Sequence, residues 1–343
     1  MANNQILVTG GLGYIGSHTV VELINAGFEP IIIDNLSNSE VKVLDAIEKI
    51  TGKKCLFHQV EMCNYAELES IFIKYPEMKA AIHFAAFLLV NESVDNPLKY
   101  YENNLLSTIN LLRCQSKFGT KGLIFSSSCT VYGNPEVLPV AENAPIQEAV
   151  SPYGNTKKMC EDIIRDTTIA SDVKAIALRY FNPIGAHPTS LIGEVQHGMP
   201  HHLVPFITET AHGKREFLRV FGDDYNTVDG SCVRDYIHVM DVAKAHVNAV
   251  QRFAHGAMES SYEVYNLGMG VGMSVIQMIQ AFERATGINI PYKIVDRRGG
   301  DVEAVYADTS LANKKLNWKT QFGIEEALKS AWDWEIAQAK LKQ

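Results

Sequence analysis

Short apolar runs alternate with helix-like patterns through the first half of the chain, and this alternation restricts the fold more than any other feature. Strands are expected at 5–9, 30–34, 56–61, 80–84, 122–127 and 173–180, and helices at 14–25, 66–74, 97–117 and 153–168. The strand-like runs are apolar on both faces, which is typical of a parallel sheet buried between two helical layers. The sequence therefore predicts an α/β fold with a doubly wound, Rossmann-type parallel sheet.

The second half of the chain has a different texture. Gly, Pro, His and Asn are frequent between residues 182 and 235, and helix patterns return at 242–251 and 275–286. No low-complexity linker separates the two halves. We therefore expect a first domain over residues 1–180 and a smaller, mixed α/β lobe over 181–343, with some segments of the second half returning to the first domain.

Composition excludes several classes of protein. The net charge of −8 argues against a general nucleic-acid binder. No apolar run approaches about 18 residues, so no membrane span is expected, and the first residues lack the basic region of a signal peptide. The six cysteines are scattered without a C-x-x-C pair. This pattern favours reduced thiols and a cytoplasmic location.

A glycine-rich turn, GGLGYIG at residues 10–16, lies between the first expected strand and the first expected helix. This spacing lets the backbone approach a pyrophosphate at a helix N-terminus, although an ordinary turn is the alternative. Asp34 ends the second expected strand, where a carboxylate accepts a bond from a ribose 2′-hydroxyl and repels a 2′-phosphate. The next basic residue, Lys42, is not placed to hold a 2′-phosphate. The sequence therefore predicts NAD rather than NADP, and a helix cap is the alternative role for Asp34.

Tyr153 and Lys157 stand four residues apart, which places a phenol and an ammonium on one helix face. A nearby cation favours the phenolate and lowers the phenol pKa, and a positively charged nicotinamide would lower it further. Ser128 follows a buried strand, at the sheet edge where such folds bind ligands. Tyr75 and Lys79 repeat the spacing after a finished helix, where a structural role is favoured. Tyr153, Lys157 and Ser128 are thus the catalytic candidates.

Longer motifs carry a resemblance to a known family. They are VTGGLGYIGSHT (8–19), DNLSNS (34–39), FSSS (125–128), TVYG (130–133), SPYG (151–154), LRYFNP (178–183), VRDYIHVMD (233–241) and YNLG (265–268). With these motifs the chain resembles the extended short-chain dehydrogenase/reductases, and among them the UDP-glucose 4-epimerases (UDP-galactose 4-epimerases). The resemblance implies NAD-dependent interconversion of UDP-galactose and UDP-glucose through a 4-keto intermediate. It also implies a homodimer built on the long helices at 97–117 and 153–168.

The same resemblance assigns ligand contacts residue by residue. For NAD it implies Gly10, Gly13, Tyr14, Ile15, Gly16, Asp34, Asn35, Asn38, Ser39, Glu61, Met62, Phe84, Ala85, Ala86, Leu88, Asn103, Ser128, Tyr153, Lys157 and Phe181. For the UDP-hexose it implies Ser128, Tyr153, Asn182, His202, Arg219, Val220, Phe221, Arg234, Arg298, Asp301 and Val305. Two arginines on a diphosphate suit an acidic protein, because the guanidinium fork matches phosphate oxygens.

The chain departs from the family pattern at several of these positions. Leu88 stands where a lysine is expected near the NAD pyrophosphate, which removes a charged contact. Glu61 replaces an aspartate near the adenine, and His202 replaces an asparagine near the substrate. Val305 stands at a position beside the sugar that is often tyrosine. Its small side chain predicts room for an N-acetyl group, so UDP-N-acetyl-hexosamines are candidate substrates.

Two other functions are compatible with the same fold. A nucleotide-sugar 4,6-dehydratase needs an acid pair after the strand-end serine, and this chain has Cys129 and Thr130 there. A non-catalytic NAD-binding protein would be expected to lose the tyrosine or the lysine, which this chain keeps. The HGMPHH segment at 197–202 lacks accompanying acidic or cysteine ligands, so no metal site is expected.

Overall fold

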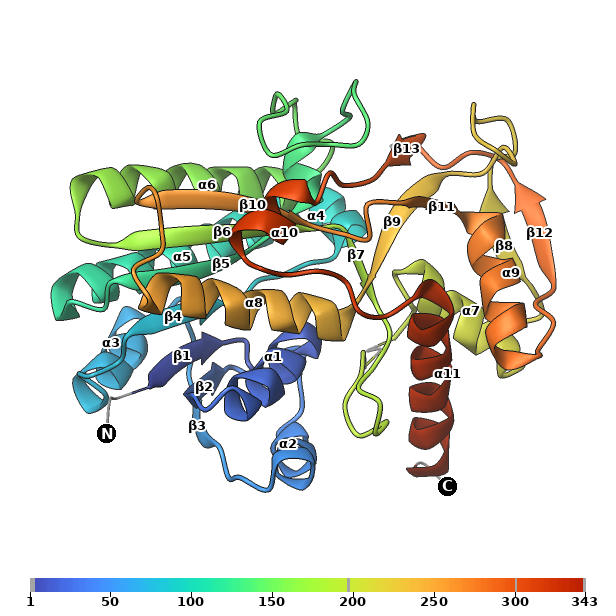
Figure 1. Ribbon diagram of the computed structural model, residues 1–343. Helices are drawn as coiled ribbons and strands as arrows, with labels where there is room; N and C mark the ends of the chain where they lie inside the picture. The colour runs from blue at the N-terminus through green and yellow to red at the C-terminus, as the bar shows by residue number, and fades with distance from the viewer. Residues whose placement is uncertain (1–3, 196–197, 300, 342–343) are drawn as a thin grey trace.

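The computed structural model describes residues 4–195, 198–299 and 301–341 (Figure 1). Its centre is a seven-stranded parallel sheet in the order β10–β6–β5–β4–β1–β2–β3. The strands are β1 (Gln5–Thr9), β2 (Glu29–Asp34), β3 (Leu56–Gln59), β4 (Ala80–His83), β5 (Gly122–Ser128), β6 (Lys174–Tyr180) and β10 (Tyr262–Leu267). The chain builds outward from β1 on one side and then from β4 on the other, which confirms the predicted doubly wound topology.

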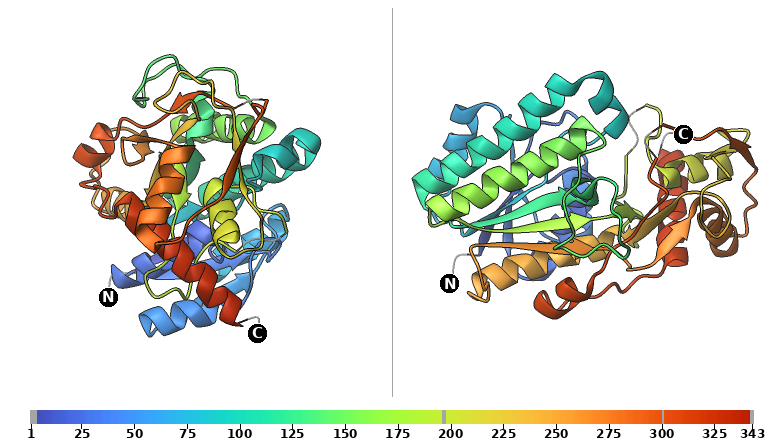
Figure 2. Two further views of the ribbon diagram at one scale, coloured as in Figure 1. Left: turned by 90° about the vertical axis from the view of Figure 1, so that its right-hand side faces the viewer. Right: turned by 90° about the horizontal axis from the view of Figure 1, so that it is seen from above.

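Helices cover both faces of this sheet, as the views in Figures 1 and 2 show. One face carries α1 (Tyr14–Asn25), α2 (Val43–Thr51) and α8 (Val239–Ala254), and the other carries α3 (Tyr65–Lys74), α5 (Pro97–Phe118) and α6 (Pro152–Ala170). Alternate strand residues feed two separate cores: Ile6 and Val8 pack under α1 and α8, whereas Leu7 packs under the opposite layer. This two-sided burial explains why the strands read as continuous apolar runs.

The predicted elements of the first half are present, with shifted ends. The strand expected to reach residue 61 ends at Gln59, and the one expected to reach 84 ends at His83. The helix expected from residue 153 already begins at Pro152, because Ser151 caps it and proline suits a first helical position. The sequence analysis did not predict α2, the short α4 (Val90–Asp95) or the 3-10 turn η1 (Cys129–Tyr132).

The smaller lobe has short strands and its own core. A four-stranded sheet contains β7 (Asn182–Ile184), β9 (Val233–His238), β11 (Gly272–Ser274) and β13 (Ala304–Val305), while β8 (Leu218–Phe221) pairs with β12 (Tyr292–Val295). The helices are α7 (Leu203–Ala211), α9 (Val275–Thr286), α10 (Ser310–Lys315) and α11 (Ile324–Leu341). Val204, Phe282 and Leu328 belong to a third core that joins α7, α9 and α11.

Two elements from the second half of the chain belong to the seven-stranded sheet and the helices that cover it. Strand β10 pairs with β6 as the last strand of the parallel sheet, and α8 packs against α1. The chain therefore passes between the two lobes more than once (Figure 2, right). Within the described residues, no helix combines the length and apolar character needed to cross a membrane.

Candidate active site

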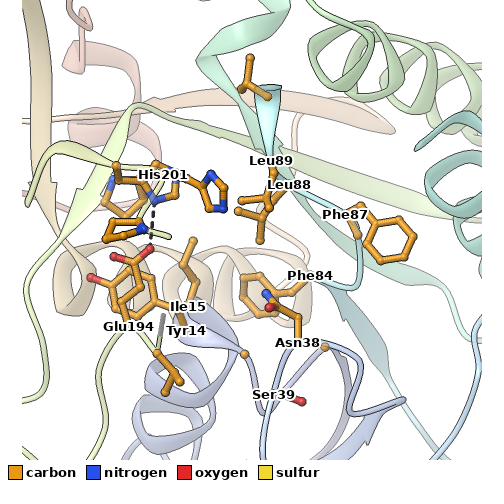
Figure 3. Close-up of a pocket in the computed structure, with 18 of the residues that line it drawn as sticks. Tyr14, Ile15, Asn38, Ser39, Phe84, Phe87, Leu88, Leu89, Glu194 and His201 are labelled. Carbon is orange, nitrogen blue, oxygen red and sulfur yellow. Dashed lines mark hydrogen bonds and ion pairs between the residues drawn. The ribbon is translucent and has the colours of Figure 1, made fainter. Parts of the chain in front are cut away.

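A large cleft runs along the carboxyl edge of the parallel sheet and continues into the smaller lobe. Its volume is about 1690 Å³. A pocket for one small ligand typically has about 300–1,000 Å³, so this cleft has room for a dinucleotide and a second ligand. Figure 3 shows part of it, with Tyr14, Ile15 and Glu194 on one side and Phe84 and Phe87 on the other.

The glycine-rich turn forms the floor of the cleft at the start of α1. Gly10 has a φ of +65°, and a Cβ on it would lie 2.8 Å from the Ala85 nitrogen. A Cβ on Gly16 would lie 2.3 Å from the Gly10 carbonyl oxygen, so both positions exclude a side chain. Gly13 is the N-cap of α1, and among the described residues no side chain caps the first-turn amides. These open amides fit an anion such as a pyrophosphate.

Asp34 is held firmly at the end of β2. Its carboxylate accepts hydrogen bonds from the Leu12 nitrogen at 3.1 Å, the Leu36 nitrogen at 2.9 Å and the Ser39 hydroxyl at 2.7 Å. A carboxylate has about four acceptor sites, so one remains for a ribose hydroxyl. Lys42 lies beyond it in an ion pair with Glu40. The environment of Asp34 thus fits the ribose of NAD.

Glu61 and Asn35 frame the same end of the cleft. The Asn35 amide donates to Glu61 Oε2 at 2.9 Å, and Glu61 Oε1 accepts from the Cys63 nitrogen at 3.0 Å. The longer glutamate side chain is therefore fixed by contacts at both oxygens. The donor and acceptor groups at this end of the cleft are thus held in place by the protein's own contacts.

The candidate catalytic side chains lie in the middle of the cleft. Ser151 caps α6 by accepting from the Gly154 nitrogen at 3.1 Å, and this places Tyr153 and Lys157 on the face toward the sheet. The Lys157 ammonium donates to the Ser126 carbonyl oxygen at 2.7 Å. Ser128 Oγ accepts from the nitrogen and the hydroxyl of Thr130, at 3.2 and 3.0 Å. The Ser128 hydroxyl hydrogen is therefore free to be donated toward Tyr153 or a substrate.

Burial dominates the electrostatics of this group. It raises the pKa of Tyr153 above its usual value, and the Tyr180 phenol adds to the rise while the Ser128 hydroxyl opposes it. Burial also lowers the pKa of Lys157 to about 8. Without NAD, burial thus outweighs any lowering by the Lys157 cation, and the net direction of the phenol pKa is upward. The ammonium lies 5.9 Å from the Tyr153 ring centroid and donates to Ser126.

Cations of the smaller lobe line the far end of the cleft. Asp301 accepts from Arg298 at 2.7 and 3.2 Å and lies 3.7 Å from Arg234. His202 Nδ1 lies 3.0 Å from Glu194 Oε1, and this contact raises the pKa of His202 against the opposing effect of burial. Arg234 and Arg298 thus bring two guanidinium groups to this part of the cleft, which suits a diphosphate.

The cleft brings together nearly all of the residues predicted from the sequence. Every predicted NAD contact lines it, as do Asn182, His202, Arg219, Phe221, Arg234, Arg298 and Asp301. Val220 and Val305 do not line it, because Val220 packs in the core of the smaller lobe and Val305 packs with Phe181 and Val131. The proposed role of Val305 therefore stays a prediction.

Sequence reasoning missed several cleft residues. Glu194 stands eight positions before its partner His202 in a segment without periodicity, so no local signal joins them. Tyr180 was visible as part of a motif, but its contact with Ser126 required the β5–β6 pairing. Among the described residues no cluster of His, Cys, Asp or Glu could hold a metal ion, and His197 lies outside them.

Comparisons with known proteins agree with this arrangement. The model of the family described as GDP-mannose 4,6 dehydratase matches residues 7–331. The UDP-glucose 4-epimerase of Bacillus subtilis is 46% identical over 331 residues, which cover 96% of each chain. The enzyme of that name from Dictyostelium discoideum is 48% identical over 97% of this chain and 96% of its own.

Solved structures extend the similarity to three dimensions. The UDP-glucose 4-epimerase of Stenotrophomonas maltophila, with bound NAD and formylated UDP-arabinopyranose, has a TM-score of 0.95 and 43% identity. The similarity covers 98% of this chain and 99% of that one. The UDP-Glc/GlcNAc 4-epimerase of Campylobacter jejuni has a TM-score of 0.84 and 34% identity, over 97% and 99% of the two chains.

Proposed function

The chain belongs to the family of the GDP-mannose 4,6-dehydratase model and, within that family, to the UDP-glucose 4-epimerases. We propose below which residues carry out the epimerisation and how. It is an NAD-dependent isomerase that interconverts UDP-galactose and UDP-glucose by inverting C4 of the hexose through a 4-keto intermediate. The observation that carries the residue assignment is the position of Tyr153, Lys157 and Ser128. All three line the same cleft as the glycine-rich turn and the arginines Arg234 and Arg298.

Tyr153 is the proposed general base and acid. Its phenolate removes the proton of the C4 hydroxyl. After the 4-keto sugar has rotated in the cleft, the phenol returns a proton to the C4 oxygen. Ser128 donates a hydrogen bond to the C4 oxygen, and Lys157 orients the nicotinamide ribose. NAD, when bound, supplies the acceptor and later the donor of the C4 hydrogen as hydride. Its positive charge also opposes the rise that burial causes in the pKa of Tyr153.

The smaller lobe is proposed to hold the UDP moiety. Arg234 and Arg298 pair with the diphosphate, while Asn182 and His202 donate further hydrogen bonds, and Phe221 lies beside the uracil. The Arg298 guanidinium already lies 5.5 Å from the Phe221 ring centroid. With this assignment, residues 1–180 bind mainly NAD and residues 181–343 bind mainly the UDP-sugar.

The family model is named after a dehydratase, but the residues after Ser128 favour epimerisation. Elimination of water needs an acid and a base beside the sugar, and Cys129 and Thr130 have no carboxyl group. Burial raises the pKa of the Cys129 thiol to about 12, so this group remains protonated at neutral pH. We therefore assign no dehydration to this site.

The proposed assembly is a homodimer in the cytoplasm. Helices α5 and α6 pack side by side, and Leu98, Ile109, Met159 and Ile169 on them have exposed apolar side chains. A second copy of the same two helices would cover these residues. Sedimentation equilibrium of wild type and of Met159→Asp tests this, since a dimer through this face predicts a monomeric variant.

The decisive assay is conversion of UDP-galactose to UDP-glucose by the purified protein, with and without added NAD. Conversion without addition indicates retained cofactor despite Leu88 in the cofactor side of the cleft. Conversion only after NAD is added indicates that Leu88 weakens retention. No conversion in either case overturns the proposed substrates. UDP-N-acetylgalactosamine in the same assay tests the room predicted at Val305.

A further inference from the structure

His83 lies at the centre of a buried hydrogen-bond chain beneath the cleft. It pairs in register with Thr9 of the neighbouring strand, and its Nδ1 lies 2.8 Å from the Thr9 hydroxyl. The same Thr9 oxygen accepts from the Ala85 nitrogen at 3.2 Å. On its other side, His83 Nε2 lies 3.2 Å from the Thr108 hydroxyl in α5. The imidazole is almost completely buried and does not line the cleft.

The directions of these bonds follow from counting hydrogens. The Thr108 hydroxyl donates its single hydrogen to the Asn104 carbonyl oxygen at 2.9 Å, so toward His83 it acts as acceptor. His83 therefore carries its hydrogen on Nε2, and its Nδ1 accepts from the Thr9 hydroxyl. This tautomer, assigned from the network, uses every donor once. The chain runs in one direction from Ala85 through Thr9, His83 and Thr108 to Asn104.

One end of the chain holds the cofactor side of the cleft. We call residues 84–87, which line the cleft between β4 and α4, the cofactor wall. Its Ala85 nitrogen lies so close to Gly10 that a Cβ there would come within 2.8 Å. Thr9 immediately precedes this glycine and accepts from Ala85. The bond from Thr9 to His83 thus fixes the distance between the glycine-rich turn and the cofactor wall.

The other end reaches the catalytic helix. The Asn104 side chain accepts from the Phe87 nitrogen at 2.9 Å and donates to the Phe87 oxygen at 3.1 Å. It also donates to the Thr156 hydroxyl at 3.1 Å, and Thr156 donates to the Tyr153 carbonyl oxygen at 2.7 Å. The cofactor wall and the first turn of α6 are therefore tied to one asparagine, whose own carbonyl receives the chain from His83.

We propose that His83 is a positioning residue for the epimerase reaction, acting as a neutral imidazole that aligns the glycine-rich turn, the cofactor wall and the Tyr153 helix. This role of His83 rests on the proposed function, because the reaction that His83 supports is the epimerisation assigned there. Its effect on NAD binding can be measured whether or not the substrate assignment holds. His83 touches neither ligand, so its influence must pass through Thr9 and Thr108.

The surroundings keep this imidazole neutral. The Lys157 cation acts on it, and both groups contact the Phe125 ring, whose centroid lies 6.0 Å from the imidazole centroid and 5.0 Å from the ammonium. Burial and this cation lower the pKa of His83 to about 3. A protonated ring would leave the Thr9 hydroxyl hydrogen without an acceptor. The neutral, Nε2-protonated form is therefore the one that the chain requires.

Three substitutions separate the bond between Thr9 and His83 from the bond between His83 and Thr108. His83→Leu removes both bonds. His83→Asn places an acceptor near the Nδ1 position and keeps the bond from Thr9, whereas His83→Gln places a donor near Nε2 and keeps the bond to Thr108. Gln115→Met is the matched control, because Gln115 is a fully buried side chain of α5 that donates to Thr120 and Gly122 at the opposite sheet edge. Each variant is measured for Tm, for the Kd of NAD by calorimetry, and for kcat and KM with UDP-galactose.

His83→Leu is expected to weaken NAD binding and to lower kcat, each about tenfold or more, with the KM for UDP-galactose within twofold of wild type. His83→Asn should restore most of the NAD affinity, and His83→Gln should restore kcat more than affinity. Equal losses in Gln115→Met at a matched fall in Tm, or unchanged NAD affinity and kcat in His83→Leu, would overturn the proposal. If His83→Leu does not fold, identical behaviour of the Asn and Gln variants overturns it.

Discussion

At the residue scale, the proposed general base, Tyr153, is a phenol that burial makes harder to ionise. Tyr153 is half-buried and lines the cleft with Tyr180, and burial together with the Tyr180 phenol raises its pKa. The Lys157 ammonium lies one helical turn away but donates a hydrogen bond to the Ser126 carbonyl oxygen. The side chains alone therefore disfavour the phenolate, and in the proposed mechanism the positive charge of bound NAD would favour it.

Tyr153→Phe removes the proposed base and leaves the ring packing intact. We expect kcat to fall by about 10²–10⁴, the usual contribution of a positioned general acid–base group. The Tm and the NAD content should stay near wild-type values, since the ring is kept and the hydroxyl lies toward the cleft and Ser128 rather than in the hydrophobic core. A variant that keeps more than a tenth of wild-type kcat would contradict the assignment of Tyr153.

Lys157→Met separates stability from activity. Burial lowers the lysine pKa from 10.5 to about 8, so the unfolded chain binds a proton more tightly than the folded one between these values. Wild-type stability therefore rises with pH across this window, and below pH 8 the buried charge costs stability. We expect the variant to lose turnover while its Tm at pH 7 is not below that of wild type. Thermal unfolding at pH 7 and pH 10 should show the variant's advantage shrinking as the pH rises.

At the element scale, the first turn of α6 is the local structure that the site depends on most. Ser151 caps this helix two residues before Tyr153. Ser151→Ala should cost about 1 kcal/mol of stability and lower kcat, because the fraying turn carries the catalytic phenol. Ser274→Ala removes the cap of α9 and is the control, with a similar stability cost and unchanged kcat. Equal kcat values in the two variants would show that the cap does not position Tyr153.

How far each element could be predicted follows from how its residues are buried. The parallel strands were predictable because both faces are apolar, as at Ile31–Ile33. Helix α2 was missed because Lys42 is a poor N-cap and only Ile47 of the helix is buried. The strands of the smaller lobe are two to six residues long, and β13 contains only Ala304 and Val305. Their pairing depends on distant partners such as β9, which local patterns do not reveal.

The site shows the same division between local and distant information. Gly10, Asp34, Tyr153 and Arg234 lie in motifs that can be read along the chain. Glu194 beside His202, and His83 between Thr9 and Thr108, become visible only when separate elements are brought together. Val305 differs from these residues, because the family resemblance predicts a sugar contact there, while the structure packs its side chain with Phe181 and Val131 and not in the lining of the cleft.

At the scale of the whole molecule, buried neutral histidines make the fold sensitive to acid. Burial lowers the pKa of His18 and His83 to about 3, and that of His238 and His246 to about 4. The unfolded chain takes up these protons near pH 6.5, so stability is lost as the pH falls from about 6.5 toward 4. Each histidine contributes a slope of up to about 1.4 kcal/mol per pH unit.

Urea unfolding at pH 7.5, 6.5 and 5.5 checks this expectation. The free energy of unfolding should fall most steeply between the last two values. His246→Phe should reduce the pH dependence of the free energy of unfolding by the contribution of one histidine. Phenylalanine suits this site because the Nε2 of His246 has no hydrogen-bond partner among the described residues and its ring contacts Phe84. A pH-independent free energy of unfolding over this range would contradict the expectation.

Strand β10 forms the edge of the large sheet, and it is synthesised after all the other strands of that sheet. A ribosome releases the first six strands long before residue 262, so the nascent sheet has an unpaired β6 edge and a face not yet covered by α8. Such an edge is a template for pairing with other chains until the last strand arrives. A message truncated before Leu267 would therefore yield an aggregation-prone fragment rather than a free nucleotide-binding half.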